Sequence, residues 1–148
     1  MTIDDIAALP VSNLATNDAH LWLWTTNQFL EDGFRIMRGW GFKYLAPIHW
    51  VKPCGIGAWF VHRTQTLLFG YHEKCVFPLA RYKPNIIEAP VAREHSAKPD
   101  QSYNYIEKIS PGPRLELFAR EYTPMFKKRE GWDTWGNDIP NDVELIVS

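Results

Sequence analysis

The sequence is poor in the features that mark secreted, disulfide-stapled or membrane-spanning proteins. Only two cysteines occur among 148 residues. Cys54 and Cys75 have neither a pairing nor a metal-ligand spacing. With no signal peptide in the sequence, this cysteine usage is typical of a reducing compartment, so we expect a cytoplasmic protein. No apolar segment approaches the roughly 20 residues that cross a bilayer, and no membrane partner is predicted.

The sequence also lacks a large excess of positive or negative charge, and it lacks several catalytic motifs. The formal net charge is −1. The chain as a whole is therefore not a polycation, and a nucleic-acid substrate would require a local basic patch. A glycine-rich phosphate loop and a Gly-x-Ser-x-Gly elbow are absent. The histidines show no metal-ligand spacing, so the sequence predicts no metal site.

Apolar segments alternate with amphipathic ones along the chain. We expect strands at 20–26, 42–51, 66–71, 85–89 and 114–119, helices at 30–41 and from about 99, and a loop at 52–60. Strands that alternate with helices predict an α/β protein with a doubly wound, mostly parallel sheet. A chain of this length is most simply one domain, covering residues 1–148.

Two charged residues near the second helix attract attention as ligand-binding candidates. Lys98 precedes Pro99 at the helix start. A cation is unfavourable there because the exposed amides already make that end positive, which favours a bound carboxylate or phosphate. Glu116 lies inside an apolar strand, where a carboxylate can organise a ligand. The alternatives are a solvated loop lysine, and a glutamate that faces solvent or pairs with Arg114.

Two further segments each have two interpretations. Lys127, Lys128 and Arg129 form a basic cluster, helped by Arg81 and Lys83, that either is a solvated loop or contacts a nucleic-acid backbone. The segment GWDTWGND ends in Asn137 and Asp138. These side chains either cap a turn or bind ribose hydroxyls and an adenine edge.

Taken together, six segments resemble one family over essentially the whole chain. They are LPVSNLATNDAHLWLWTTNQFL, WGFKYLAPIHWVKP, GAWFVHRTQTLLFG, IIEAPVAREHSAKPD, YIEKISPGPRLELFARE and GWDTWGND. The sequence resembles the METTL-type (MT-A) adenine methyltransferases, the family of the eukaryotic messenger-RNA adenosine methyltransferase and many phage and bacterial relatives. The resemblance implies a Rossmann-like fold that binds S-adenosylmethionine, with the cofactor half placed C-terminally.

The resemblance also implies roles for individual residues. Lys98 would lie near the methionine carboxylate of the cofactor, and Glu116 and Arg120 around its ribose and amino-acid moiety. Asn137 and Asp138 would border the nucleoside, although relatives usually carry Gln or Glu where the shorter Asp138 stands. Three residues are candidates for the substrate side: Trp59, His62 and Gln65, the last of which stands where relatives commonly have a glutamate.

One element of the family is missing from the sequence. Relatives carry an Asp-Pro-Pro-Trp motif after their first strand, and this chain contains no Pro-Pro pair at all. The resemblance begins just after that motif, so we expect the first strand and the catalytic loop to be lacking and assign no catalytic residue. The expected function is S-adenosylmethionine-dependent methyl transfer to the 6-amino group of adenine in DNA or RNA. A start codon placed too late, or a second methyltransferase-fold chain that supplies the motif, would reconcile this with catalysis. The alternative is a non-catalytic subunit that stabilises a partner or binds nucleic acid.

Overall fold

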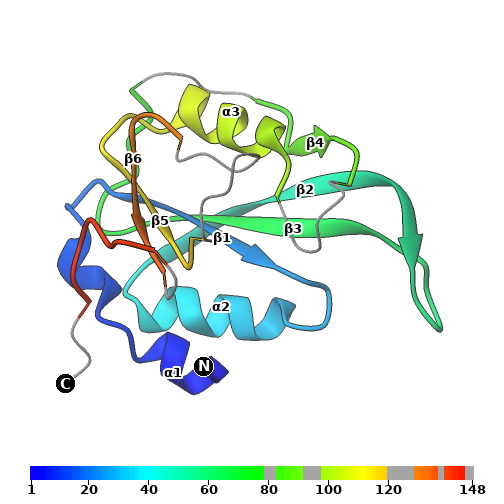
Figure 1. Cartoon of the computed structure of the whole chain (residues 1–148), viewed down its shortest axis with the longest axis horizontal. Helices are drawn as coiled ribbons and strands as arrows, with labels where there is room; N and C mark the ends of the chain where they lie inside the picture. Colours follow the sequence, from blue (N-terminus) through cyan, green and yellow to red (C-terminus); the bar gives the residue numbers. More distant parts are fainter. Residues whose placement is uncertain (79–82, 92–97, 120–128, 137–138, 146–148) are drawn as a thin grey trace. The chain divides into compact units, whose positions relative to one another are not determined.

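The computed structural model describes residues 1–78, 83–91, 98–119, 129–136 and 139–145. The chain divides into two compact units, Met1–Ser110 and Pro111–Ser148, each described here by itself. The first unit contains α1 (Ile3–Ala7), the 3-10 helix η1 (Val11–Leu14), β1 (His20–Thr25), α2 (Leu30–Gly39), β2 (Lys43–Ile56), β3 (His62–Tyr71), β4 (Ile86–Glu88) and α3 (Asp100–Ile109) (Figure 1). The second contains β5 (Arg114–Leu117) and β6 (Trp132–Trp135).

The first unit is built on a four-stranded sheet of mixed direction. Its strand order is β1-β3-β2-β4. Strand β3 is antiparallel to both β1 and β2, whereas β4 is parallel to β2. Strands β1, β2 and β4 therefore run in one direction, and β3 runs against them. The mixed α/β class predicted from the sequence is confirmed.

Two details of the predicted sheet are wrong. The expected loop at 52–60 is largely strand, because β2 continues to Ile56 and pairs there with His62 of β3. The sheet is also not mostly parallel in its pairing, although three strands share a direction. Only residues 57–61 join β2 to β3, and so short a connection requires antiparallel neighbours. A side chain at Gly57 would overlap the carbonyl oxygen of Phe60, so this tight turn requires glycine.

Helices cover both faces of this sheet, as expected for a doubly wound arrangement (Figure 1). On one face, Gly33 of α2 lies against the side chain of Thr25. On the other, Tyr105 of α3 packs edge-on against Trp22, with ring centroids 5.9 Å apart. Residues 22 and 25 point to opposite faces because side chains alternate along a strand. The nearly continuous apolar sequence of β1 follows from this two-sided cover.

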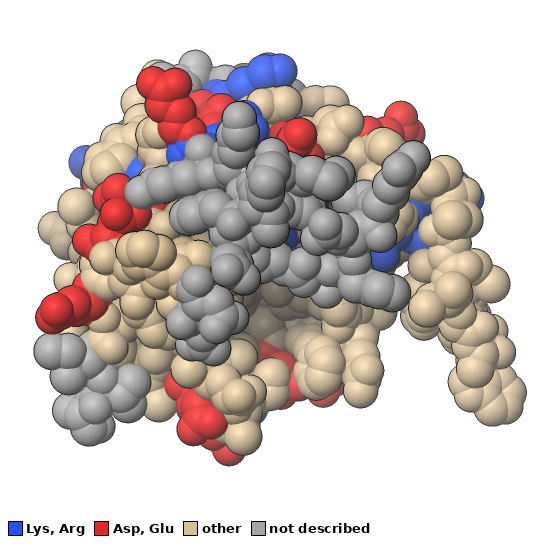
Figure 2. All heavy atoms as spheres, viewed as in Figure 1, with Lys and Arg blue, Asp and Glu red and all other residues tan. Residues whose placement is uncertain are grey.

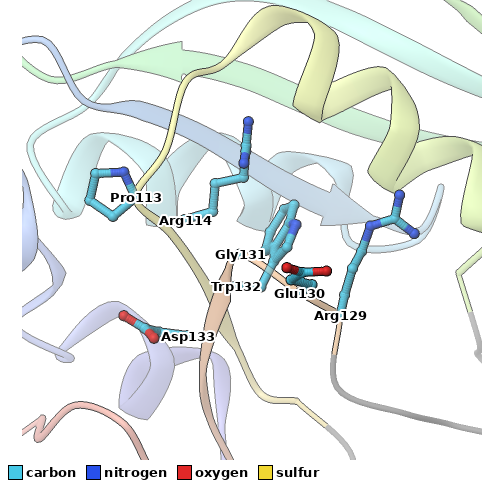
Figure 3. Close-up of a pocket in the computed structure, with 7 residues that line it drawn as sticks. All are labelled: Pro113, Arg114, Arg129, Glu130, Gly131, Trp132 and Asp133. Atoms are coloured by element: carbon cyan, nitrogen blue, oxygen red, sulfur yellow. The ribbon is translucent and has the colours of Figure 1, made fainter.

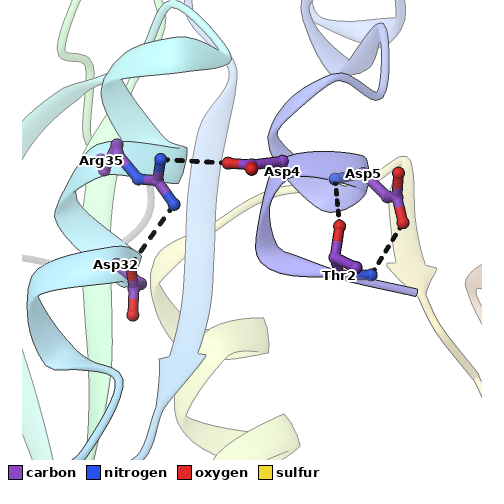
Figure 4. Close-up of polar contacts among 5 residues, drawn as sticks. All are labelled: Thr2, Asp4, Asp5, Asp32 and Arg35. Carbon is purple, nitrogen blue, oxygen red and sulfur yellow. Dashed lines mark hydrogen bonds and ion pairs between the residues drawn. The ribbon is translucent and has the colours of Figure 1, made fainter.

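The N-terminus is fastened to α2 by polar contacts (Figure 4). Thr2 and Asp5 form a reciprocal capping box at the start of α1. The backbone N–H of Thr2 and its hydroxyl hold the pKa of the Asp5 carboxyl below its usual value. Arg35 of α2 pairs with Asp4 at 3.1 Å and with Asp32 at 3.4 Å. These pairs are exposed, so they orient α1 more than they stabilise the fold.

A hydrogen-bonded histidine ties the end of α3 to β1. The His20 ring lies 2.7 Å from the carbonyl oxygen of Val76 through Nε2 and 2.6 Å from Ser110 Oγ through Nδ1. A carbonyl only accepts, so Nε2 carries the proton and donates to Val76. The Trp22 indole N–H also donates to Ser110 Oγ, at 2.8 Å. One partly buried hydroxyl thus joins a helix end to two strand residues.

Replacing His20 by phenylalanine should lower the free energy of unfolding by about 1–3 kcal/mol, since the Val76 carbonyl loses its donor and the Ser110 hydroxyl loses its acceptor. Phenylalanine keeps the ring that packs on Phe69, with centroids 5.1 Å apart. Urea denaturation measures the change. His62→Phe, at an exposed position, is the matched control and should leave stability nearly unchanged. Equal stability of His20→Phe and wild type would show that this network contributes nothing.

The second unit pairs β5 and β6 in parallel, with Glu116 opposite Thr134. Strand β6 was not predicted from the sequence. Asp142 supports it by accepting hydrogen bonds from the backbone N–H of Thr134 at 2.9 Å and from its hydroxyl at 3.3 Å. Beyond the strands, the Ala119 N–H donates to the Trp135 carbonyl at 2.9 Å. The segment after β5 therefore stays hydrogen-bonded to the last residue of β6, two residues past Leu117.

Candidate cofactor and substrate site

The carboxyl ends of β1 and β4 lie at one edge of the first unit's sheet. Helix α3 begins at this edge, because Lys98, just before the helix, lies at Trp24, while Ser110 at its other end binds Trp22. The helix therefore runs antiparallel to β1 and directs its N-terminus to the carboxyl edge. In α/β proteins ligands bind at this edge, where helix N-termini favour anions. The N-cap Pro99 provides no side-chain cap for the first amides of α3.

Two tryptophans and two lysines form a cation–aromatic array at this edge. Lys98 Nζ lies 5.1 Å from the ring centroid of Trp24, and Lys52 Nζ lies 5.1 Å from that of Trp50. The two indoles pack edge-to-face with centroids 6.1 Å apart. Trp50 is buried, and its indole N–H donates to the Ala89 carbonyl at 2.9 Å. Contact with aromatic faces positions both ammonium groups.

Strand register places Gln65 on the same face as this array. Gln65 pairs directly with Trp50, and Leu67, two residues further along β3, pairs with Trp24. Directly paired residues, and residues two apart on one strand, share a face. Because β3 lies between β1 and β2, the half-buried Gln65 is on the strand between the two tryptophans. Two predicted residues, Lys98 and Gln65, therefore belong to one surface.

Glu116 lies in the second unit, which is described by itself. Its side chain is half-buried on β5, one residue before the strand ends. Phe118 follows with a φ of 60°, which non-glycine residues rarely adopt, and its ring packs edge-on against Trp135 at 5.4 Å. Such backbone strain is concentrated at functional sites. The carboxyl end of β5 is thus the strained end of this unit.

A pocket of about 430 Å³ lies at the opposite end of β5 and β6. Its lining includes Arg114 and Trp132, the first residues of the two strands, together with Pro113, Arg129, Glu130, Gly131 and Asp133 (Figure 3). Arg114 and Arg129 point to one side of the strands, and Asp133 points to the other. Ligands in α/β folds bind at carboxyl ends, so this pocket is not the expected cofactor site.

Comparison with known proteins decides the family. The MT-A70 family matches residues 1–138 of the chain. The chain belongs to the MT-A70 family. This confirms the resemblance drawn from the sequence segments.

Three relatives of this MT-A70 chain are longer than the part that it matches. It is 34% identical to the N(6)-adenosine-methyltransferase MT-A70-like of Arabidopsis thaliana, over 99% of this chain and 22% of that protein. It is 30% identical to the N(6)-adenosine-methyltransferase catalytic subunit METTL3 of Homo sapiens, over 94% of this chain and 25% of that protein. It is 28% identical to the Type II methyltransferase M.MunI of Mycoplasma sp, over 98% and 61% respectively. The chain thus spans about a quarter or less of the plant and human relatives.

The remaining predicted residues of the MT-A70 chain differ in what the structure says of them. Trp59 and His62 are exposed at the end of the β2–β3 hairpin, and the Asn27 side-chain amide donates to His62 Nδ1 at 3.0 Å. Arg129 is half-buried and lines the pocket at the amino ends of β5 and β6. Six residues lie outside the described part of the chain, and their roles stay predictions: Arg81, Arg120, Lys127, Lys128, Asn137 and Asp138.

Sequence reasoning missed the two aromatic members of the array, Trp24 and Trp50, although Lys52 was expected at a strand end. A signal was present, because Trp22 and Trp24 alternate in β1 and Trp50 and Lys52 alternate in β2. Alternation predicts a shared face, but the pairing of β1 and β2 through β3 had to be known before the faces could be matched.

Among the residues that the structure describes, no group of three or more His, Cys, Asp and Glu side chains is placed to hold a metal ion. Within the same described residues, no helix combines the length and apolarity that a membrane crossing requires.

Proposed function

We propose that this MT-A70 chain holds S-adenosylmethionine, on a Rossmann-like fold, for methyl transfer to the 6-amino group of an adenine in DNA or RNA. The observation that carries the proposal is Lys98 at the N-terminus of α3, on the carboxyl edge of the sheet. Three co-directional strands with helices on both faces support the Rossmann-like assignment. Cys54 and Cys75 are both exposed and are not joined in a disulfide, which fits a reducing compartment such as the cytoplasm.

The residues present fit the cofactor. The Lys98 ammonium and the first amides of α3 would hold a carboxylate, since both favour an anion. Glu116, at the carboxyl end of β5, would accept hydrogen bonds from ribose hydroxyls, with Arg120, Asn137 and Asp138 completing the set. When bound, the cofactor supplies an electrophilic methyl group on a positively charged sulfur.

The substrate side demands hydrogen-bond acceptors. The 6-amino group of adenine is a poor nucleophile because its lone pair is delocalised into the ring. Hydrogen-bond acceptors for its two N–H groups localise the lone pair on the nitrogen. Alignment of the nitrogen with the methyl group of the donor lowers the barrier further. Gln65 offers a side-chain carbonyl on the same face as Lys98, where it would meet one N–H. We assign no catalytic residue, because no Asp-Pro-Pro-Trp occurs in these 148 residues. A second methyltransferase-fold chain is one source of the remaining acceptors.

A second candidate function involves no chemistry: a methyltransferase-fold subunit that binds nucleic acid or stabilises a partner. Such a subunit has no chemical need for a cation beside an uncapped helix N-terminus at the carboxyl edge. The position of Lys98 therefore favours a chain that binds S-adenosylmethionine over a non-catalytic subunit.

A radiolabel assay tests the proposed function. The chain, alone and with a candidate partner chain, is incubated with S-adenosylmethionine carrying a tritiated methyl group and with adenine-containing DNA or RNA oligonucleotides. We expect label only in oligonucleotides with adenine. The control oligonucleotide replaces each adenine by purine, which lacks the 6-amino group. Label in the purine control would contradict the site of methylation, and donor binding without label in any combination would favour the non-catalytic subunit.

A further inference from the structure

The β2–β3 hairpin extends beyond the rest of its sheet as an arm, defined here as residues 52–65. Strand β1 pairs with β3 only as far as Thr66, and β4 pairs with β2 only as far as Val51. Past Val51 and Thr66, strands β2 and β3 therefore pair only with each other. Figure 1 shows the arm projecting past the helices and the other strands of the first unit.

The tip of this arm exposes large apolar side chains to water. Trp59 is 94% exposed, Phe60 76%, Val61 66% and Ile56 87%. Single exposed apolar residues are common, but four of them gathered at one projecting turn mark a contact surface. Two of the four are aromatic and carry the largest apolar area.

The charge of the arm indicates what the tip contacts. The arm contains Lys52 and Arg63 and no acidic residue, and no Asp or Glu occurs anywhere between Asp32 and Glu73. The Arg63 side chain donates from Nε to the Lys52 carbonyl at 3.1 Å, which orients its guanidinium across the base of the arm. Figure 2 shows an uncharged projecting tip with basic side chains near its base. Proteins that bind single-stranded nucleic acid combine exposed aromatic side chains, which stack on unpaired bases, with nearby cationic side chains, which contact phosphates. The arm has the aromatic side chains at its tip and the cationic ones at its base.

We propose that the arm binds single-stranded nucleic acid, with Trp59 and Phe60 stacking on unpaired bases and Arg63 contacting phosphate. The choice of ligand rests on the proposed function. Gln65 lies on β3 at the base of the arm, and Phe60 lies five positions before it in the sequence. At about 3.3 Å per residue, the tip lies roughly 15 Å beyond the site, a few nucleotides from a base held there. The tip therefore binds the nucleic-acid strand on one side of the target adenine.

Fluorescence anisotropy of the whole chain tests the arm. The probes are one adenine-containing 15-nucleotide single strand as DNA and the same sequence as RNA, both labelled at one end. We expect the double variant Trp59→Ala/Phe60→Ala to bind roughly tenfold to a hundredfold more weakly than wild type. Phe29→Ala, an exposed aromatic outside the arm, is the matched control and should bind as wild type does. A plot of log affinity against log salt concentration has a negative slope. Arg63→Gln should make that slope shallower by about 0.7, because one phosphate contact is lost.

Three results would overturn the proposal: wild type that binds neither probe, a double variant that binds like wild type, or a loss that Phe29→Ala shares. One form of the second result is a double variant that keeps its oligonucleotide affinity and turns a dimer into a monomer in sedimentation. That result would make the tip a contact between copies of the chain. Calorimetry with S-adenosylmethionine on the same variants keeps the two proposals apart. A double variant that binds the cofactor normally but has lost the oligonucleotide supports the arm, whereas failure of the wild type to bind cofactor concerns only the proposed function.

Discussion

Replacing Gly33 by alanine is expected to destabilise the protein by about 2 kcal/mol, because the added methyl group overpacks a filled contact. A Cβ at this position would overlap the Cγ2 methyl of Thr25 and lie 3.2 Å from Leu68 Cδ1. Thr25 cannot easily yield, since its χ1 is stiff and its hydroxyl donates to the Thr66 carbonyl at 3.3 Å. The overlap outweighs the gain of about 1 kcal/mol that alanine brings to a helix interior. Urea denaturation gives the difference directly.

Gly39 offers the matched control in the same helix. It is exposed at the last position of α2, and a Cβ there would meet no atom within 4 Å. Gly39→Ala should therefore stabilise the protein by up to about 1 kcal/mol, through helix propensity and a less flexible unfolded chain. The two identical substitutions should change stability in opposite directions. If both stabilise, α2 does not pack closely on Thr25 and the sheet–helix contact is wrong.

Replacing Lys98 by methionine should weaken S-adenosylmethionine binding by roughly tenfold to a hundredfold. A hydrogen bond to a charged group contributes about 1.5–3 kcal/mol, and methionine removes the ammonium while keeping an apolar stem for the Trp24 contact. Titration calorimetry measures the affinity. Thermal melting should change little, because Lys98 is only half-buried.

Lys108 provides the comparison for Lys98. It is exposed in the last turn of the same helix, far along α3 from the carboxyl edge. Lys108→Met removes an equal charge, so it should leave cofactor affinity unchanged while losing a favourable contact with the helix dipole. Equal weakening by both substitutions would assign the effect to net charge and would remove Lys98 from the binding site.

The sequence predicted the helices and the strand cores well, because each has strong local periodicity. The segment from Leu30 followed helical spacing, and α2 ends at Gly39 where glycines interrupt the pattern. Proline at 99 marked the start of α3 within one residue. Such signals depend only on neighbours in the chain.

Pairing and short strands were not predictable in the same way. The segment after Lys52 looks like a loop because it contains Pro53 and two glycines, yet β3 supplies enough partners to extend β2 to Ile56. Strand β6 has only four residues and depends on β5 and Asp142 for its hydrogen bonds. Tertiary partners of this kind override local propensity.

The candidate site shows the same division. Lys98 was recognised from a local conflict, a cation at a helix N-terminus, and needed no knowledge of the fold. Trp24 and Trp50 required the strand order, because they lie on two strands that meet only through β3. Gln65 was noted as a departure from the family, but its place on their shared face emerged only from the register.

The most direct test of the central claim is titration calorimetry of the wild-type chain with S-adenosylmethionine, after cooperative melting has shown that the domain is folded. The account predicts saturable heat that fits one site per chain, since Lys98 and the α3 amides form an anion-binding end at the carboxyl edge. No saturable heat from the folded domain would contradict the donor-site assignment and leave the non-catalytic subunit as the better description.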